Sequence, residues 1–312
     1  MIITLTPNPS VDRTLHVPQL RFNEVLRAHD VRVDWGGKGF NVSRALRILN
    51  EETLALAWVG GGTGRMMQHG LNQLGIKTDF VWVEEETRIN TVAQEDSGEW
   101  YIRLNEPGPH IPEDAIQSLL AKAEAYASKK DIWVAAGSLP QDVPADFYTQ
   151  LIHLLKNKGV RVFFDANGEA LRAGLSDPPF LVNPDITETE NYVGFSIHNY
   201  EDAKHAVLPF LRLGVEYVAL SIDGLGLLLA SQQEMMLATP PKVSIRNVTG
   251  AGDALMAGMA YGFARGMDLR EIARLGAAFS AVAVATASLA SVKNSDVEAM
   301  LPRVEVRTVN VM

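Results

Sequence analysis

Short β-rich runs alternate with segments of helical periodicity along most of this chain, and that alternation limits its fold more than any other feature of the sequence. Buried strands are expected at 2–6, 53–60, 131–137, 160–166, 215–222 and 226–230. Helices are expected at 40–50, near 64–74, in 112–128, near 144–158 and, as two consecutive Ala- and Gly-rich segments, between about 250 and 290. Strands and helices in this order predict a mostly parallel sheet covered by helices, an α/β fold.

Two regions interrupt this alternation. Residues 11–34 and 78–105 resemble strands without helices between them, and the second region contains an Asp-Ser-Gly turn typical of a hairpin. We expect both to form a small β-sheet that serves as a lid over one end of the main sheet, or as a dimer contact. No linker or repeat divides the 312 residues, so one domain spanning 1–312 is the simplest organisation.

Charge and rare residue types exclude several classes of protein. The chain has 28 Lys and Arg against 37 Asp and Glu, and its formal charge of −9 argues against a nucleic-acid or anionic-membrane partner. It has no cysteine, and its seven histidines lack the spacing of metal ligands. No apolar run approaches the roughly 18 residues of a membrane span. The opening MIITLTPNPSVD also lacks the features of a signal peptide, so we expect a cytoplasmic protein.

Two glycine-rich stretches do not complete a nucleotide-binding motif. In VGGGTGRMMQHG, at 59–70, neither register places a third glycine where a dinucleotide fingerprint needs it, which argues against a nicotinamide dehydrogenase. WGGKGFN, at 35–41, has Gly39 where a Walker A loop has Ser or Thr. Its glycines suit a tight strand-to-helix turn, or backbone N–H groups that face an oxygen-rich ligand with Lys38 and Asn41 nearby.

The stretch NVTGAGDALMAG, at 247–258, carries the most specific signal. Gly250 and Gly252 allow the backbone to expose N–H groups before a helix starts, and the positive end of the helix dipole adds to them. Such an anion hole suits a transferring phosphoryl group. Asp253 lies at the same place, where a carboxylate could accept a proton from an attacking hydroxyl, although a helix-capping Asp is an ordinary alternative.

These stretches resemble the two signatures of the ribokinase-like, or PfkB, carbohydrate kinases. Further matches follow in the family's order: TLTPNPSVDRTLHV, TRIN, NEPGP, AAGSLPQDVP, FDANGEALRAGL and PPKV. Within the family the set is most similar to the 1-phosphofructokinases, with the tagatose-6-phosphate kinases close beside them. The resemblance implies a three-layer α/β/α domain with a β-sheet lid, and ATP-dependent phosphoryl transfer, with Mg²⁺, to a sugar-phosphate hydroxyl.

The resemblance also implies roles for individual residues. Asp253 would be the general base, assisted by the backbone of Gly250, Ala251 and Gly252. The residues expected to bind the phosphosugar are Asp12, Gly36, Gly37, Lys38, Asn41, Arg88, Asn90, Arg103 and Ser138. Those expected to bind ATP are Asp185, Ser221, Gly224, Gly226, Asn247 and Gly252, while Glu188 would hold Mg²⁺ through water.

Two of these assignments have a chemical reason and an ordinary alternative. Asp12 would bind sugar hydroxyls, because a carboxylate accepts two hydrogen bonds from a diol, although it could equally cap a turn. Arg88 would hold the existing phosphate from the lid, because a guanidinium fork matches phosphate oxygens. An arginine on a hairpin is otherwise usually solvated.

Two motifs depart from the family pattern. Asn183 and Asp185 stand where the family has Lys and Asn, and Asp223 stands where it has a glycine. An added carboxylate near the triphosphate would alter the Mg²⁺ requirement or weaken ATP binding, so we expect Asp223 to face away or the loop to shift onto Gly224. A phosphosugar-binding protein with little kinase activity is therefore an alternative, against which the retained Asp253 argues.

The resemblance therefore implies a kinase that converts fructose 1-phosphate to fructose 1,6-bisphosphate. A tagatose-6-phosphate or fructose-6-phosphate kinase is the alternative within the same chemistry. We also expect a homodimer formed through the lid, because an exposed β-sheet invites a second copy.

Overall fold

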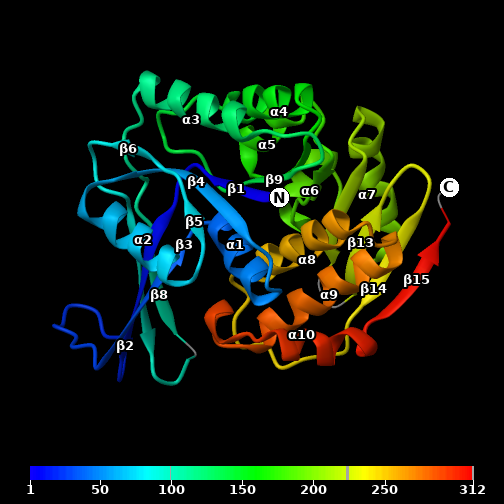
Figure 1. Cartoon of the computed structure of the whole chain (residues 1–312). Coiled ribbons are helices and arrows are strands. Elements are labelled where there is room, and N and C mark those ends of the chain that lie inside the picture. The colour runs from blue at the N-terminus through cyan, green and yellow to red at the C-terminus, as the bar shows by residue number, and fades with distance from the viewer. Residues whose placement is uncertain (99, 223–224, 311–312) are drawn as a thin grey trace.

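The computed structural model describes residues 1–98, 100–222 and 225–310. A central sheet of eleven strands runs through this part of the chain (Figure 1). From one edge to the other its strands are β15 (Glu305–Val309), β14 (Met235–Thr239), β13 (Gly226–Ala230), β12 (Tyr217–Ile222), β11 (Leu181–Val182), β10 (Arg161–Asp165), β9 (Ile132–Ala136), β1 (Ile2–Thr6), β4 (Thr53–Gly60) and β5 (Lys77–Thr78). A further strand, β6 (Val81–Val83), also pairs with β4.

The strands from β12 to β5 are parallel, while β12, β13, β14 and β15 pair antiparallel at the other edge. The α/β fold expected from the sequence is thereby confirmed. The parallel part has one functional consequence, because the carboxyl ends of these strands lie at one edge of the sheet, where open α/β sheets bind their ligands.

Helices cover both faces of the central sheet, so the domain has three layers (Figure 1). One face carries α1 (Lys38–Ile48), α8 (Ala251–Arg265), α9 (Leu269–Ala285) and α10 (Asn294–Met300). The other face carries α3 (Glu113–Tyr126), α4 (Phe147–Asn157), α5 (Gly168–Gly174), α6 (Ile186–Val193) and α7 (Tyr200–Leu213). A further helix, α2 (Gly61–Gln73), packs beside β4.

Buried strands supply both layers of the core by simple alternation. On β9, Ile132 and Val134 belong to the cluster beneath α1, α8 and α9, whereas Trp133 belongs to the cluster beneath α3 and α4. On β10, Phe163 belongs to the first of these clusters and Phe164 to the second. Successive side chains of a strand point to opposite faces, so a strand covered on both sides must be apolar throughout. This is why these strands read as continuous apolar runs.

A second, four-stranded sheet stands apart from the central one, with the order β3 (Asp30–Gly36), β2 (Ser10–Val17), β7 (Ile89–Glu95) and β8 (Tyr101–Leu104). We call it the small sheet. The antiparallel pair β7 and β8 matches the expected hairpin. The expected lid segment 78–105 divides between the two sheets, since β5 and β6 pair with β4 and only β7 and β8 join the small sheet. Alternating residue patterns do not reveal which sheet a strand will join.

Within the described ranges, each helix is too short or too polar to cross a membrane. The cytoplasmic location expected from the sequence stays a prediction.

Candidate active site

A cavity of about 920 Å³ opens at the carboxyl ends of the parallel strands, between the central sheet and the small sheet. Thr6 at the end of β1, Gly137 just after β9, Asp165 at the end of β10, Asn183 just after β11 and Ser221 near the end of β12 all line it. The strand order brings together residues that are more than 200 positions apart in the sequence, which is the placement expected for a ligand site in an α/β sheet.

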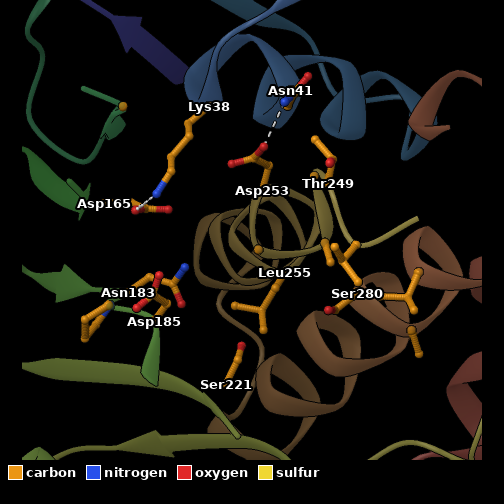
Figure 2. A pocket seen from close by; sticks show the side chains of 18 of the residues that line it. Lys38, Asn41, Asp165, Asn183, Asp185, Ser221, Thr249, Asp253, Leu255 and Ser280 are labelled. Carbon is orange, nitrogen blue, oxygen red and sulfur yellow. Dashed lines mark hydrogen bonds and ion pairs between the residues drawn. The ribbon is translucent and has the colours of Figure 1, made fainter. Parts of the chain in front are cut away.

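Asp253 lies where α8 begins, and its side chain points toward Asn41 on α1 (Figure 2). Gly250 occupies the N-cap position with φ of +84°, a left-handed conformation that glycine adopts without strain. Since Gly250 holds that position, Asp253 is not the capping residue of α8. The Asp253 side chain is only 7% exposed, and its Oδ2 accepts a hydrogen bond of 2.8 Å from Asn41 Nδ2. Its carboxylate is therefore held by α1 and directed into the cavity.

The surroundings of Asp253 bring its titration close to neutral pH. Burial raises the pKa of the Asp253 carboxyl to about 7, and the nearby negative charge of Asp165 adds to that effect. The hydrogen bond from Asn41 and the positive charges of Lys38 and Arg44 act in the opposite direction. A buried carboxylate that exchanges its proton near pH 7 is suited to general-base chemistry.

Lys38, on the first turn of α1, forms an ion pair with Asp165 at the end of β10 (Figure 2). Lys38 Nζ donates to Asp165 Oδ1 at 2.6 Å. Burial alone would lower the pKa of the Lys38 ammonium, but the ion pair with Asp165 outweighs it and raises the pKa above its usual value. Lys38 is therefore positively charged at any physiological pH. It lines the cavity near the carboxylates of Asp165 and Asp253.

Asp12 reaches the cavity from the small sheet and is held in place by its neighbours. Its Oδ1 accepts hydrogen bonds from Ser10 Oγ at 2.7 Å and from Asn90 Nδ2 at 2.9 Å. Gly36 on the adjacent strand allows this approach, because a Cβ atom there would lie 2.3 Å from Asp12 Oδ2. Gly36 itself does not line the cavity, so its contribution is to leave room for the Asp12 carboxylate.

Arg88 lies at the same end of the cavity and is oriented by three backbone carbonyls. Its guanidinium donates to the carbonyl oxygens of Asn8 at 2.8 Å, Glu106 at 3.1 Å and Pro9 at 3.4 Å. Burial lowers its pKa somewhat, as does the positive charge of nearby Arg103, while Asp12 acts in the opposite direction. Arg88 and Arg103 together make this end of the cavity positively charged, which suits an anionic ligand.

Several polar atoms that line the cavity lack a partner within the protein. Across the described residues, eight buried side-chain nitrogen or oxygen atoms have no hydrogen-bond partner. Four of them are oxygens of cavity-lining residues, namely Thr6 Oγ1, Asn8 Oδ1, Asn90 Oδ1 and Asn183 Oδ1. Buried polar atoms are normally paired, so this concentration indicates a ligand that supplies hydrogen-bond donors, as a polyhydroxylated molecule does.

The opposite end of the cavity is largely apolar. Its wall consists of Ile222, Leu227, Pro240, Pro241, Val243, Ile245, Val248, Leu255, Ala277, Ala281 and Val284, with Ser221, Gly226, Lys242 and Ser280 among them. A polar end with two arginines and an apolar end, separated by Asp253 and Lys38, can accommodate two different ligands whose reacting groups meet at the middle.

The NPDITE segment has a local structural role as well as a position at the cavity. Asp185 is the N-cap of α6, and its Oδ1 accepts from Glu188 N at 2.6 Å, while Glu188 Oε2 accepts from Asp185 N at 2.9 Å. This reciprocal pair is a capping box. Burial raises the pKa of the Glu188 carboxyl to about 7. Asp185 lines the cavity, whereas Glu188 does not.

In the part of the chain that the structure describes, no group of three or more His, Asp or Glu side chains is arranged to hold a metal ion. The donor set nevertheless fits Mg²⁺, because this ion is usually bound through one or two carboxylates and substrate phosphates. Asp185 and Glu188 would supply those carboxylates.

The cavity brings together most of the residues singled out in the sequence. The expected residues that line it are Asp12, Gly37, Lys38, Asn41, Arg88, Asn90, Arg103, Ser138, Asp185, Ser221, Gly226, Gly250, Ala251, Gly252 and Asp253. Those that do not are Gly36, Glu188 and Asn247. Asn247 instead stabilises a turn, since its Oδ1 accepts from Thr249 N at 2.9 Å. Gly224 and Asp223 lie outside the described residues.

Sequence reasoning missed Asp165 and most of the apolar wall. The position of Asp165 in the sequence could have identified it as a site residue. It is the first acidic residue at the carboxyl end of the apolar run at 160–166, and α/β sheets present ligand-binding groups from that position. Ser280 and Ala281 had none, since they lie within a helix whose small residues read only as packing.

Comparisons with known proteins agree with this geometry. Residues 7–295 match the model of the pfkB family of carbohydrate kinases. The chain is 33% identical to the 1-phosphofructokinase of Bacillus subtilis over 307 residues, 98% of this chain and 99% of that protein. It is 29% identical to the 1-phosphofructokinase of Vibrio cholerae over 283 residues, 91% and 89% of the two chains. A solved structure of phosphofructokinase-2 from Escherichia coli with fructose-6-phosphate superimposes with a TM-score of 0.89 at 28% identity, covering 96% and 98% of the two chains.

Proposed function

Because this chain belongs to the pfkB family of carbohydrate kinases, phosphotransferases with an alcohol acceptor, we propose that it converts fructose 1-phosphate and ATP to fructose 1,6-bisphosphate and ADP. One observation carries the proposal: the buried carboxylate of Asp253 lies behind the Gly250 turn, between an end of the cavity with two arginines and an apolar end. The arginines suit the phosphate already on the sugar, and the apolar wall suits the nucleotide base. Two relatives named 1-phosphofructokinase favour this acceptor over a 6-phosphate.

The proposed reaction is an in-line displacement at the γ-phosphorus of ATP. A new bond forms between the free sugar hydroxyl oxygen and the γ-phosphorus, the bond from that phosphorus to the β,γ-bridging oxygen breaks, and ADP leaves. Asp253 accepts the hydroxyl proton. The backbone N–H groups of Gly250 and Gly252 would face the migrating phosphoryl group, where the N-terminal end of α8 also favours negative charge, whereas Ala251 N donates to Val248 O at 3.3 Å.

The sugar would be oriented by side chains from both sheets. Asp12 accepts hydrogen bonds from the sugar hydroxyls, and Arg88 with Arg103 binds the phosphate already present. Gly37, Asn41, Asn90 and Ser138 complete this end of the cavity. Asp185 and Glu188 would hold Mg²⁺ together with the ATP phosphates, and the ion would supply positive charge that offsets the charge of those phosphates. Lys38, paired with Asp165, adds a fixed positive charge beside Asp253.

The substrate assignment is tested by measuring coupled ADP release from the purified protein with Mg-ATP. The acceptors are fructose 1-phosphate, fructose 6-phosphate, tagatose 6-phosphate, fructose and ribose. Preference for fructose 1-phosphate is expected. Preference for one of the 6-phosphates would correct the acceptor and keep the chemistry. No turnover on any of them, with a phosphosugar that still raises the melting temperature, would favour a binding protein.

The pH dependence of turnover follows from the position of Asp253. As a general base it must be deprotonated, and its pKa is raised to about 7, so kcat/KM should fall as the pH drops through about 7. Below that point the expected slope is about tenfold per pH unit. The measurement is kcat/KM for the phosphosugar across the pH range at saturating Mg-ATP. A profile that stays flat well below this pH would contradict the assigned base.

A homodimer through the small sheet is part of the same proposal. The register places Val31, Val33 and Leu104 on the face opposite the one that carries Asp12 and Asn90. These three apolar side chains are 46%, 43% and 64% exposed, and Arg13 and Thr91 lie between Val33 and Leu104 on the same face. A second copy of the small sheet would cover them.

The dimer is tested with Leu104→Asp, which places a charge on that apolar face. Sedimentation or light scattering should report a dimer for the wild-type chain and a monomer for this variant. Tyr101→Asp is the matched control, since Tyr101 lies on the opposite face of the same strand and is equally exposed at 65%. A wild-type monomer, or a Leu104→Asp variant that remains dimeric, would contradict the proposal.

A further inference from the structure

Arg44 connects the small sheet to the carboxylate of Asp253 through consecutive hydrogen bonds. It lies on α1 and is only 8% exposed. Its Nη2 donates to Asp34 Oδ1 on β3 at 2.6 Å, and its Nη1 donates to Asn41 Oδ1 at 3.3 Å. Asn41 Nδ2 in turn donates to Asp253 Oδ2 at 2.8 Å. A continuous path therefore runs from a strand of the small sheet to the proposed general base.

The chemistry of these groups allows only one orientation of the Asn41 amide. A guanidinium can only donate hydrogen bonds and a carboxylate can only accept them. With Arg44 on one side and Asp253 on the other, the amide must turn its oxygen toward Arg44 and its nitrogen toward Asp253. The reverse orientation would place N–H groups against a cation and an oxygen against an anion. Arg44 and Asp253 thereby favour the same orientation of Asn41, and Arg44 holds the amide from the side away from the base.

We propose that Arg44 is a positioning residue for phosphoryl transfer. Arg44 fixes the orientation of the Asn41 amide, and through this amide it favours the ionised form of Asp253 and orients its carboxylate. Asp34 in turn holds Arg44 in place. This inference rests on the proposed role of Asp253 as the base. It also gives the small sheet a second contribution beside that of Asp12 and Arg88, because β3 supports the base from behind α1. Arg44 is too far along α1 to line the cavity, so its action is indirect.

The charges that face Asp253 come from two elements. Lys38 and Arg44 on α1 favour its ionised form, and Asp165 at the end of β10 disfavours it. The helix α9 and the strands β1 and β9 also pack against α8, and within the described residues they add no charged group to this set. The Asn41 hydrogen bond, then Lys38 and then Arg44 offset the burial of Asp253, and of the two cations only Arg44 also hydrogen-bonds the Asn41 amide.

The test is the pH profile of Arg44→Gln. Without the guanidinium, the Asn41 amide is oriented by Asp253 alone and the carboxylate loses a nearby positive charge, so its proton binds more tightly. In the wild-type profile kcat falls on the acidic side, and we call this part of the profile the acid limb. In Arg44→Gln the acid limb should move to higher pH by about one unit, and turnover on it should fall by about tenfold. At alkaline pH kcat should approach the wild-type value, and the KM for ATP should stay unchanged throughout.

Arg47→Gln is the matched control, because Arg47 lies one turn further along α1 and donates to the backbone of Glu51 instead. It should keep the wild-type acid limb. Should Arg44→Gln fail to fold, Asp34→Asn decides the matter, since the Asp34 side chain is 41% exposed and the substitution is nearly isosteric. We expect a smaller shift of the acid limb in the same direction.

Two results would overturn the inference. One is an acid limb at the wild-type pH in both Arg44→Gln and Asp34→Asn. The other is a kcat lowered equally at every pH, which is the signature of a merely structural residue. The failure of the proposed function is distinguishable, because the wild-type chain would then lack turnover or an acid limb altogether.

Discussion

Asp253→Asn is expected to lower kcat by at least about 100-fold while the KM values for the phosphosugar and ATP stay within a few-fold of wild type. An asparagine fills the same volume behind the Gly250 turn but cannot accept the hydroxyl proton. The ground-state contacts of the sugar come mainly from Asp12 and Arg88, which the substitution does not touch. The loss should therefore appear in turnover and not in binding, and steady-state ADP release with a thermal-shift titration of the phosphosugar separates the two.

Asp268→Asn is the matched control for this substitution. Asp268 also lies at a helix N-terminus, where its Oδ1 accepts from Glu271 N at 2.8 Å as the cap of α9. Asparagine caps helices about as well as aspartate, so this variant should keep both turnover and stability. If Asp253→Asn turned over within a few-fold of wild type, Asp253 would not be the base, and the acid limb expected near pH 7 would need another group.

Arg88→Ala should raise the KM for the phosphosugar by roughly 10- to 100-fold, the range expected for charge-assisted hydrogen bonds to a phosphate. The three backbone carbonyls that orient its guanidinium mean that little side-chain freedom is lost on binding. The KM for ATP should change little, because the apolar wall lies at the other end of the cavity. Initial rates with each substrate varied in turn provide the measurement.

Two further variants define what Arg88 contributes. Arg88→Lys keeps the charge but loses the planar fork, so its effect on the phosphosugar KM should be intermediate. Arg32→Ala is the matched control, because Arg32 is an exposed arginine of the same small sheet that pairs with Asp30 at 3.4 Å. It should leave both KM values unchanged. An unchanged phosphosugar KM in Arg88→Ala would reject the phosphate-binding role.

Much of the fold followed from local patterns. The buried strands at 2–6, 53–60 and 226–230 agree with β1, β4 and β13 at both ends, because strands covered on both faces are apolar without interruption. The edge strands β14 and β15 were not foreseen. β14 forms a hairpin with the preceding β13, whereas β15 pairs with β14 from the far C-terminal part of the chain, a pairing that local patterns do not reveal.

The sequence by itself determined the kinase signatures, from the glycine turn before Asp253 to the TRIN segment with Arg88, since these motifs depend on backbone conformations and residue types that are local. The tertiary structure decided which distant side chains act on them. Only the fold shows that Asp165 pairs with Lys38, that Asp185 caps α6, and that Arg44 reaches Asn41 from behind the cavity. The physical reason is that charge, burial and hydrogen-bond partners depend on which residues are neighbours in space. The order of the strands in the sheet sets those neighbours.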